Sequence, residues 1–149
     1  MALGVALKLI EVGMRSHVSG VIALTPTTCH PDYVPEEFKE SFVAYDENAV
    51  GVPMIDRDSM YTMYGEPSHL FHTMTVYSIL MRLRSPTGYA GATELKDDPF
   101  IFPILHTRKA ELPAVFIVTA GADPLRDDGT IFQQALDKAG CVTPFPSQG

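Results

Sequence analysis

Leu112 to Gly129, which reads LPAVFIVTAGADPLRDDG, is the stretch of sequence that decides the fold. Residues 115–119 form an unbroken run of β-branched and aromatic side chains bounded by a proline and a glycine. Such a run predicts a short strand that is buried on both faces, as in a parallel sheet. Asp123 follows the strand, and Pro124 restricts it to extended or turn geometry. Open α/β sheets place their chemistry at the carboxyl ends of their strands, so Asp123 is the first candidate for a functional residue.

A second interpretation of Asp123 is structural. Aspartate is a favoured residue for capping a helix or for accepting hydrogen bonds from loop amides. Residues 127–139 are expected to form an amphipathic helix directly after this loop, with an aspartate in its first turn and a glycine after its last. The local pattern alone leaves both interpretations of Asp123 open.

The composition is that of a globular domain and excludes several classes of partner. The chain has 149 residues, 46% of them hydrophobic and 19% charged, which suffices for one domain with a real core. The net charge of −7 argues against nucleic acid or an anionic membrane as the main partner. No stretch reaches the ~18 apolar residues of a membrane span. Residues 1–12 lack the basic start and the cleavage site of a signal peptide. Cys29 and Cys141 form neither a disulfide framework nor a zinc motif, so we expect a cytoplasmic protein.

The remaining segments give an α/β rhythm. Residues 2–12 predict a buried helix closed by a glycine, and residues 18–24 predict a second strand. Residues 35–45 predict a helix, and Asp56 or Asp58 is expected to cap a short one that follows. Helices alternating with strands predict a mostly parallel sheet flanked by helices. Two strands leave open edges, through which a homo-oligomer is expected to form.

The motif from Asp123 to Gly129 resembles the acid-bearing motif of the hormone-sensitive-lipase-like branch of the α/β-hydrolase fold. Residues 98–105 (DPFIFPIL) are similar to the segment that precedes the acid strand in that branch. The amino-acid sequence of residues 30–35 is most similar to that of fungal esterases. The resemblance implies carboxylesterases and lipases that use a Ser–His–Asp triad on small acyl esters and need no cofactor. It gives Asp123 the part of the triad acid, with Arg126 and Asp127 as structural neighbours.

The sequence departs from this family in its catalytic motifs. It contains neither the G-x-S-x-G of a nucleophile elbow nor an H-G-G-G-type oxyanion loop, and no histidine follows Asp123. The chain is therefore expected to be a partial α/β-hydrolase fold, central to C-terminal, in which the nucleophile-elbow strand and the last strand are missing. We expect it to be inactive alone. The alternative is a non-catalytic protein that acts through association with other hydrolase subunits.

The expected domain organisation is a single partial domain over residues 1–149. Within it, residues 27–111 include a cap-like or irregular excursion. Residues 65–84 differ in sequence character from the segments that flank them. They are interpreted either as a cap insertion or as translated intron.

Other candidate sites in the sequence are weaker. His69 and His72 have helical spacing but lack further ligands, so no metal site is expected. Cys29 is expected to be a free, partly buried thiol. His106 is interpreted as a loop or helix-end residue, and the remaining pair, His17 and His30, as ordinary surface histidines.

Overall fold

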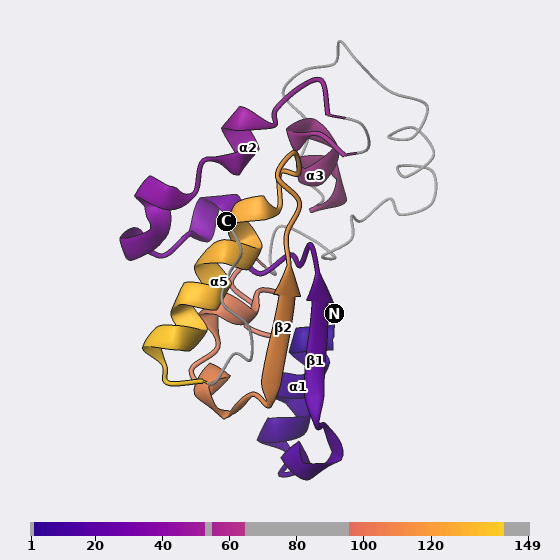
Figure 1. Cartoon of the computed structure of the whole chain (residues 1–149), viewed down its shortest axis with the longest axis vertical. Helices are drawn as coiled ribbons and strands as arrows, with labels where there is room; N and C mark the ends of the chain where they lie inside the picture. Colours follow the sequence, from indigo (N-terminus) through magenta and orange to yellow (C-terminus); the bar gives the residue numbers. More distant parts are fainter. Residues whose placement is uncertain (1, 53–54, 65–95, 142–149) are drawn as a thin grey trace.

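The centre of the structure is a pair of parallel strands that lie far apart in the sequence. The computed structural model describes residues 2–52, 55–64 and 96–141. Strand β1 (Gly20–Leu24) pairs with strand β2 (Ala114–Val118), and the register aligns Val21 with Val115. Both strands point the same way in Figure 1. The parallel α/β class is thus confirmed, and both predicted strands are present with bounds shifted by one or two residues.

The two faces of this sheet have different surroundings. Val21 and Ala23 on β1 and Val115 on β2 are buried, and they belong to the main hydrophobic cluster. The alternate residues of both strands face the other way and are largely exposed. The expectation that the strand of residues 115–119 is buried on both faces is therefore wrong for the described chain, because helices cover only one face.

Two helices cover the buried face of the sheet. Helix α1 (Ala2–Glu11) lies behind the strands in Figure 1, and helix α5 (Arg126–Lys138) lies beside β2. The left-handed backbone of Gly13, with a φ of +76°, follows the end of α1 as the sequence predicts. The side of α1 that packs on the sheet is buried, whereas Val5 on its other side is exposed. The helix is thus buried on one side rather than all round.

The excursion between the strands departs from the sequence-based expectation. The single helix predicted over residues 35–45 is wrong: a 3₁₀ helix (Glu36–Ser41) is followed, after Phe42 and Val43, by the short helix α2 (Ala44–Glu47). The break has a tertiary cause, because the carboxylate of Asp127 accepts the amide hydrogen bonds of Val43 and Ala44. These contacts fix the start of α2 against the first turn of α5.

Helices α2 and α3 lie above the carboxyl ends of the strands (Figure 1). Helix α3 (Arg57–Met63) is capped by Asp56, whose carboxylate accepts the amide hydrogen bond of Ser59 at 2.8 Å. A second hydrophobic cluster lies in this region and consists of Tyr45, Met60, Tyr64, Phe102 and Leu125. It joins the excursion to the loop that carries Asp123.

Two expectations concern parts of the chain at or beyond the limits of the described residues. The possible insertion at residues 65–84 lies outside them, and the division into a single partial domain over residues 1–149 stays a prediction. Among the helices that the structure describes, none combines the length and the apolar character needed to cross a membrane.

Candidate functional site

Asp123 lies in a turn that connects the end of β2 to α5. One carboxylate oxygen of Asp123 accepts a hydrogen bond from the amide of Leu125 at 2.8 Å. The carbonyl of Asp123 accepts bonds from the amide of Arg126 at 3.0 Å and from the side-chain amide of Asn48 at 3.4 Å. In the part of the chain that the structure describes, the second carboxylate oxygen accepts no hydrogen bond. Asp123 therefore stabilises its loop with one oxygen and keeps the other available.

Asp127 fixes the start of α5 to α2. Its carboxylate accepts the amide bonds of Val43 at 2.7 Å and Ala44 at 2.6 Å, and it pairs with the Arg126 guanidinium at 2.8 Å. Arg126 also pairs with Glu47 at 2.7 Å. Burial alone would raise the pKa of Asp127, but these three donors together hold that pKa below its ordinary value. The expected structural roles of Arg126 and Asp127 are confirmed.

Asp128 is a buried carboxyl group that the sequence analysis did not single out. One of its oxygens accepts the amide bonds of Thr28 at 2.8 Å and Cys29 at 3.0 Å. Its other oxygen is buried without a hydrogen-bond partner in the described structure. Burial raises the pKa of Asp128 to about 8, and the two amide donors offset this only in part. Burial therefore favours the protonated form of this carboxyl group.

The groups around Asp128 are also buried, and they are held in their neutral forms. The hydroxyl groups of Tyr45 and Tyr64 lie 2.8 Å apart. Burial, followed by the charge of Asp128, raises the pKa of both phenols well above the ordinary value. The same two causes raise the pKa of the Cys29 thiol, which donates to the carbonyl of His30. Because a neutral buried thiol is a poor nucleophile, the structure supports the interpretation of Cys29 as a free structural cysteine.

The histidines of the described chain serve local contacts. His30 is buried, so its expected surface position is wrong: its ring packs against Tyr33, Tyr64 and Phe102, and its Nδ1 accepts the amide bond of Asp32. Tyr33 is close to His30 in the sequence, whereas Tyr64 and Phe102 come from distant segments, so the local sequence does not show that the ring is buried.

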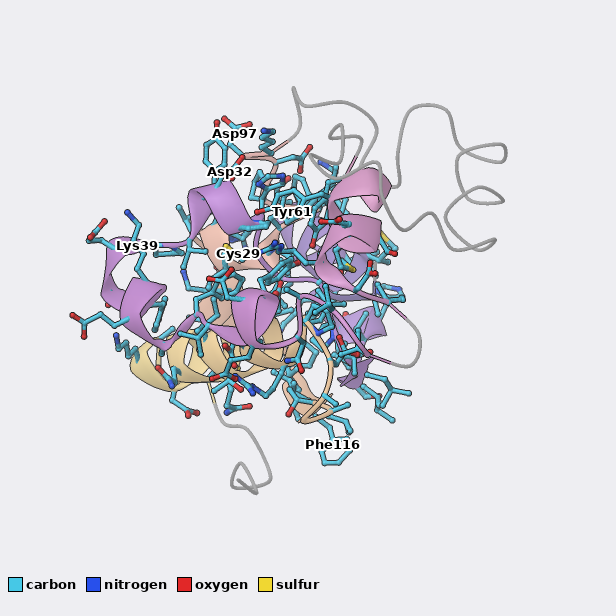
Figure 2. All side chains as sticks on the ribbon, turned by 90° about the horizontal axis from the view of Figure 1, so that it is seen from above. Cys29, Asp32, Lys39, Tyr61, Asp97 and Phe116 are labelled. Carbon is cyan, nitrogen blue, oxygen red and sulfur yellow. The ribbon has the colours of Figure 1, made fainter. Side chains whose placement is uncertain are left out.

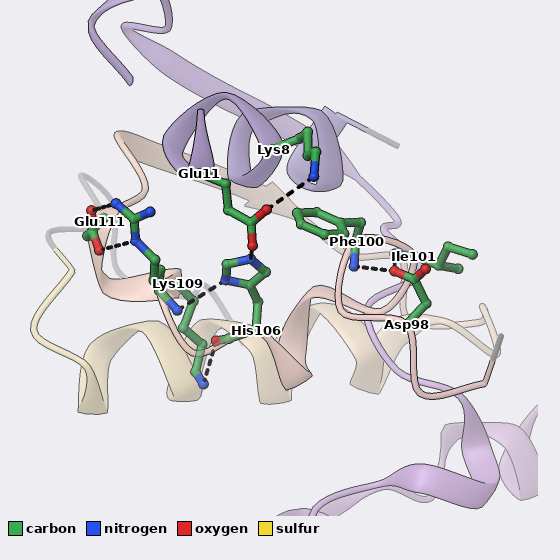
Figure 3. Close-up of polar contacts among 9 residues, drawn as sticks. Lys8, Glu11, Asp98, Phe100, Ile101, His106, Lys109 and Glu111 are labelled. Carbon is green, nitrogen blue, oxygen red and sulfur yellow. Dashed lines mark hydrogen bonds and ion pairs between the residues drawn. The ribbon is translucent and has the colours of Figure 1, made fainter. Parts of the chain in front are cut away.

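His106 is buried and directly follows the 3₁₀ helix Pro103–Leu105, which agrees with the expected loop or helix-end position. Its Nδ1 accepts the amide hydrogen bond of Arg108 at 3.1 Å, and its Nε2 lies 3.6 Å from the Glu11 carboxylate (Figure 3). The amide bond assigns the proton of the neutral ring to Nε2, which faces Glu11. Together with the bond of His17 to the carbonyl of Met14, these contacts show that the described residues form no Asp–His pair at Asp123.

A metal centre is not formed by the described residues. Within residues 2–52, 55–64 and 96–141, no three His, Cys, Asp or Glu side chains lie where they could hold an ion. The weak metal-ligand pair His69 and His72 lies outside these ranges. The chemistry that the described site offers is that of a carboxylate at a strand end.

Comparisons with known protein sequences match nearly the whole chain. The profile of a family described as having the alpha/beta hydrolase fold matches residues 1–145. The versiconal hemiacetal acetate esterase of Aspergillus parasiticus is 36% identical over 139 residues, covering 93% of this chain and 36% of the relative. The FAD-linked oxidoreductase pytB of Aspergillus terreus is 32% identical over 142 residues, covering 94% of this chain but only 14% of its own length. The chain therefore spans about a third or less of these relatives.

Solved structures show the same fold over a similar share. Vibralactone cyclase has a TM-score of 0.69 at 23% identity, covering 97% of this chain and 35% of that chain. Brefeldin A esterase, a bacterial homologue of human hormone-sensitive lipase, has a TM-score of 0.56 at 23% identity and covers 93% of this chain and 33% of its own. These likenesses confirm the alpha/beta hydrolase fold that the sequence resemblance implies.

Proposed function

Since the chain belongs to the alpha/beta hydrolase fold family, we propose that its chemistry is the hydrolysis of carboxylic esters and that Asp123 is its triad acid. The observation that carries the proposal is the position of Asp123. It follows the carboxyl end of a parallel strand, and one of its oxygens accepts no hydrogen bond from the described residues. That oxygen is suited to accept a bond from the Nδ1–H of a histidine.

In this mechanism Asp123 acts through a histidine and never touches the ester. It holds the imidazole in the tautomer whose Nε2 can take the proton of a serine hydroxyl. It then stabilises the imidazolium that forms while the serine attacks the acyl carbonyl. The sequence contains no G-x-S-x-G, so the nucleophile would have to come from outside these 149 residues.

The proposed substrate class is small acyl esters, and no cofactor is needed for this chemistry. The relative from Aspergillus parasiticus carries the name of an acetate esterase, which supports a short acyl group. A cytoplasmic location stays a prediction from the sequence.

The first experiment measures the esterase activity of the chain by itself. Hydrolysis of p-nitrophenyl acetate and butyrate is compared between the wild type and Asp123→Asn, and we expect equal background rates because the nucleophile and base are absent. A rate above background that falls in Asp123→Asn would contradict this expectation, since it would require a different nucleophile in the described chain.

The second experiment tests the role of Asp123 directly. The matched 139 residues of the Aspergillus parasiticus esterase are replaced by those of this chain, and the chimera is assayed on the same esters. Asp123→Asn is expected to lower kcat by about 10⁴-fold, as loss of the orienting acid does in a Ser–His–Asp triad. Asp137→Asn, which changes a carboxylate elsewhere on α5, is the matched control. An active chimera that tolerates Asp123→Asn would refute the assignment.

The second candidate function is association without catalysis. It is favoured by the exposed side of the sheet, which carries Ile22 and Leu24, and by the pairing of β1 and β2 only with each other among the described strands. Sedimentation of the purified chain would test the homo-oligomer expected from these open edges.

A further inference from the structure

Asn48 is a buried polar residue that contacts the turn of Asp123. It follows the last residue of α2 and is 9% exposed. Its side-chain amide donates a hydrogen bond to the backbone carbonyl of Asp123 at 3.4 Å. The two residues are 75 positions apart in the sequence, so the tertiary structure brings them together. A buried side-chain amide is costly unless it is hydrogen-bonded, and this contact explains why a polar residue is tolerated at the position.

The backbone of Asn48 does not require an asparagine. Asparagine is favoured after a helix where the chain turns into the left-handed conformation. Asn48 instead has a φ of −107° and a ψ of 31°, and its backbone amide donates to the carbonyl of Ala44 at 2.9 Å. Most residue types can adopt that backbone and make that bond. The contact of its side chain with Asp123 is therefore what an asparagine contributes at this position.

The α2 segment, which we define as residues 43–48, also contacts the start of α5. The amides of its first two residues donate to the Asp127 carboxylate at 2.7 and 2.6 Å, and Glu47 pairs with Arg126 at 2.7 Å. In Figure 2, which views the molecule from above, the excursion that carries α2 lies in front of α5. These contacts fix the segment on α5, so the amide of Asn48 is held in place beside the turn of Asp123.

The turn is thereby held at its backbone as well as at its side chain. The carbonyl of Asp123 also accepts the amide bond of Arg126 at 3.0 Å, and the carboxylate accepts that of Leu125 at 2.8 Å. The direction of a side chain depends on the backbone to which it is attached, so a fixed carbonyl restricts the direction of the carboxylate. We propose that Asn48 is a positioning residue for Asp123, whose carboxylate it keeps directed toward a histidine. The inference rests on the proposed function, in which Asp123 is the triad acid.

Hydrogen exchange of the full chain tests the contact without any need for esterase activity. Asn48→Ala is expected to speed exchange of the Leu125 and Arg126 amides about three- to tenfold, as the loss of one hydrogen bond does. The amides of β1 and β2 should keep their rates, whereas a general loss of stability would speed them as well. Asp46→Ala is the matched control, because Asp46 lies in the same segment and pairs with Arg57 at the surface.

Kinetics of the esterase chimera measure the effect on catalysis. Asn48→Ala is expected to lower kcat about tenfold and to leave KM within about twofold, because Asn48 does not touch the ester and acts on the orientation of the acid. Asn48→Asp keeps the size of the side chain but replaces its donor by an acceptor that faces the Asp123 carbonyl. This variant should lower kcat at least as much without leaving a cavity. Asp46→Ala should keep the kcat of the chimera.

The combination of Asn48→Ala with Asp123→Asn tests whether Asn48 acts through Asp123. A residue that only positions the acid has no effect once the acid is gone, so the double variant should stay within about twofold of Asp123→Asn alone. A further tenfold loss in the double variant would show that Asn48 acts independently of Asp123. Because a structural loss would persist in both backgrounds, this comparison separates positioning from destabilisation.

Three other results would overturn the inference: unchanged exchange of the Leu125 and Arg126 amides in Asn48→Ala, an equal effect of Asp46→Ala, or a full kcat in Asn48→Ala. If the last result came from a chimera that Asp123→Asn inactivates, the inference would fail and the proposed function would stand. A chimera that tolerates Asp123→Asn would refute the triad acid and its positioning by Asn48 together. The failures of the two proposals are thus distinguishable.

Discussion

Asp128, in the first turn of α5, and Thr28, in the loop after β1, form a reciprocal pair of hydrogen bonds. The amide of Thr28 donates to the Asp128 carboxylate at 2.8 Å, and the Thr28 hydroxyl donates to the Asp128 carbonyl at 2.7 Å. The two residues are 100 positions apart in the sequence. This pair fixes the helix that follows Asp123 against the end of β1, and it leaves a carboxyl group fully inside the protein.

The buried carboxyl group of Asp128 is expected to make stability depend on pH. Its pKa is raised from 3.8 to about 8 in the folded chain, so between these values the folded state keeps a proton that the unfolded state has released. The free energy of unfolding should therefore fall as pH rises from about 4 to 8, by at most about 1.4 kcal/mol per pH unit. Urea denaturation at several pH values measures this slope.

Asp128→Asn removes the titrating group and should flatten that slope. Its side-chain oxygen can still accept the amide bonds of Thr28 and Cys29. Asp137→Asn, at an exposed position of the same helix, should keep the wild-type slope. An unchanged slope in Asp128→Asn would show that another group causes the dependence.

Loss of the Asp127 carboxylate should destabilise the chain strongly. Asp127→Ala leaves the amides of Val43 and Ala44 without their acceptor and removes a pair with Arg126, at an expected cost of about 2–4 kcal/mol. Asp46→Ala is the control, because Asp46 pairs with Arg57 at the surface and should contribute less than about 1 kcal/mol. Similar denaturation midpoints for the two variants would contradict a stabilising role for the hydrogen bonds between the Asp127 carboxylate and the start of α2.

A leucine-to-alanine substitution should cost more on the helix that covers the buried face of the sheet than on the exposed face of the sheet. Leu7→Ala on α1 removes a fully buried side chain and should cost about 2–5 kcal/mol. Leu24→Ala removes a side chain that is 68% exposed and should change the free energy of unfolding by less than about 1 kcal/mol in the isolated chain. A large loss of unfolding free energy in Leu24→Ala would mean that the side of the sheet that carries Leu24 is already covered. Chemical denaturation of both variants decides the point.

Gly4 is expected to be essential for the packing of α1. A Cβ at this position would overlap the carbonyl oxygen of Phe100, which belongs to the backbone and cannot move away easily. Gly4→Ala should therefore cost about 1–3 kcal/mol, although alanine is the better helix former. Gly121→Ala has nothing within 4 Å of the added Cβ and should be nearly neutral. Equal melting temperatures of the two variants would contradict the close approach of Gly4 to the backbone of Phe100.

Asp123 should contribute little to stability. The side-chain oxygen of Asp123→Asn can still accept the Leu125 amide bond, so the variant should lose less than about 1 kcal/mol. Thermal denaturation compares it with the wild type. A loss as large as that of Asp127→Ala would favour the structural interpretation of this residue over the catalytic one.

The candidate site shows what a local pattern can and cannot predict. Asp123 stays a prediction, and it could be made from the sequence because the strand before it and the proline after it are its neighbours in the chain. Asp128 was not, because its environment depends on Thr28 and Cys29 from a distant loop. His30 was misplaced for the same reason: the aromatic rings that bury it come from other segments. No pattern of charge or spacing in the sequence near Asp128 or His30 predicts that these residues are buried.

The sequence by itself determined the α/β class, the two strands, the helices α1 and α5, and the position of Asp123 after β2. These features depend on strand propensity, helical periodicity and the glycine that follows α1, each of which is set by residues close together in the sequence. The tertiary structure decided the rest. It split the helix expected over residues 35–45, since two amides there are bound by the carboxylate of Asp127. It also decided which face of the sheet is buried, because burial depends on how many helices pack against the strands and not on the strand residues themselves.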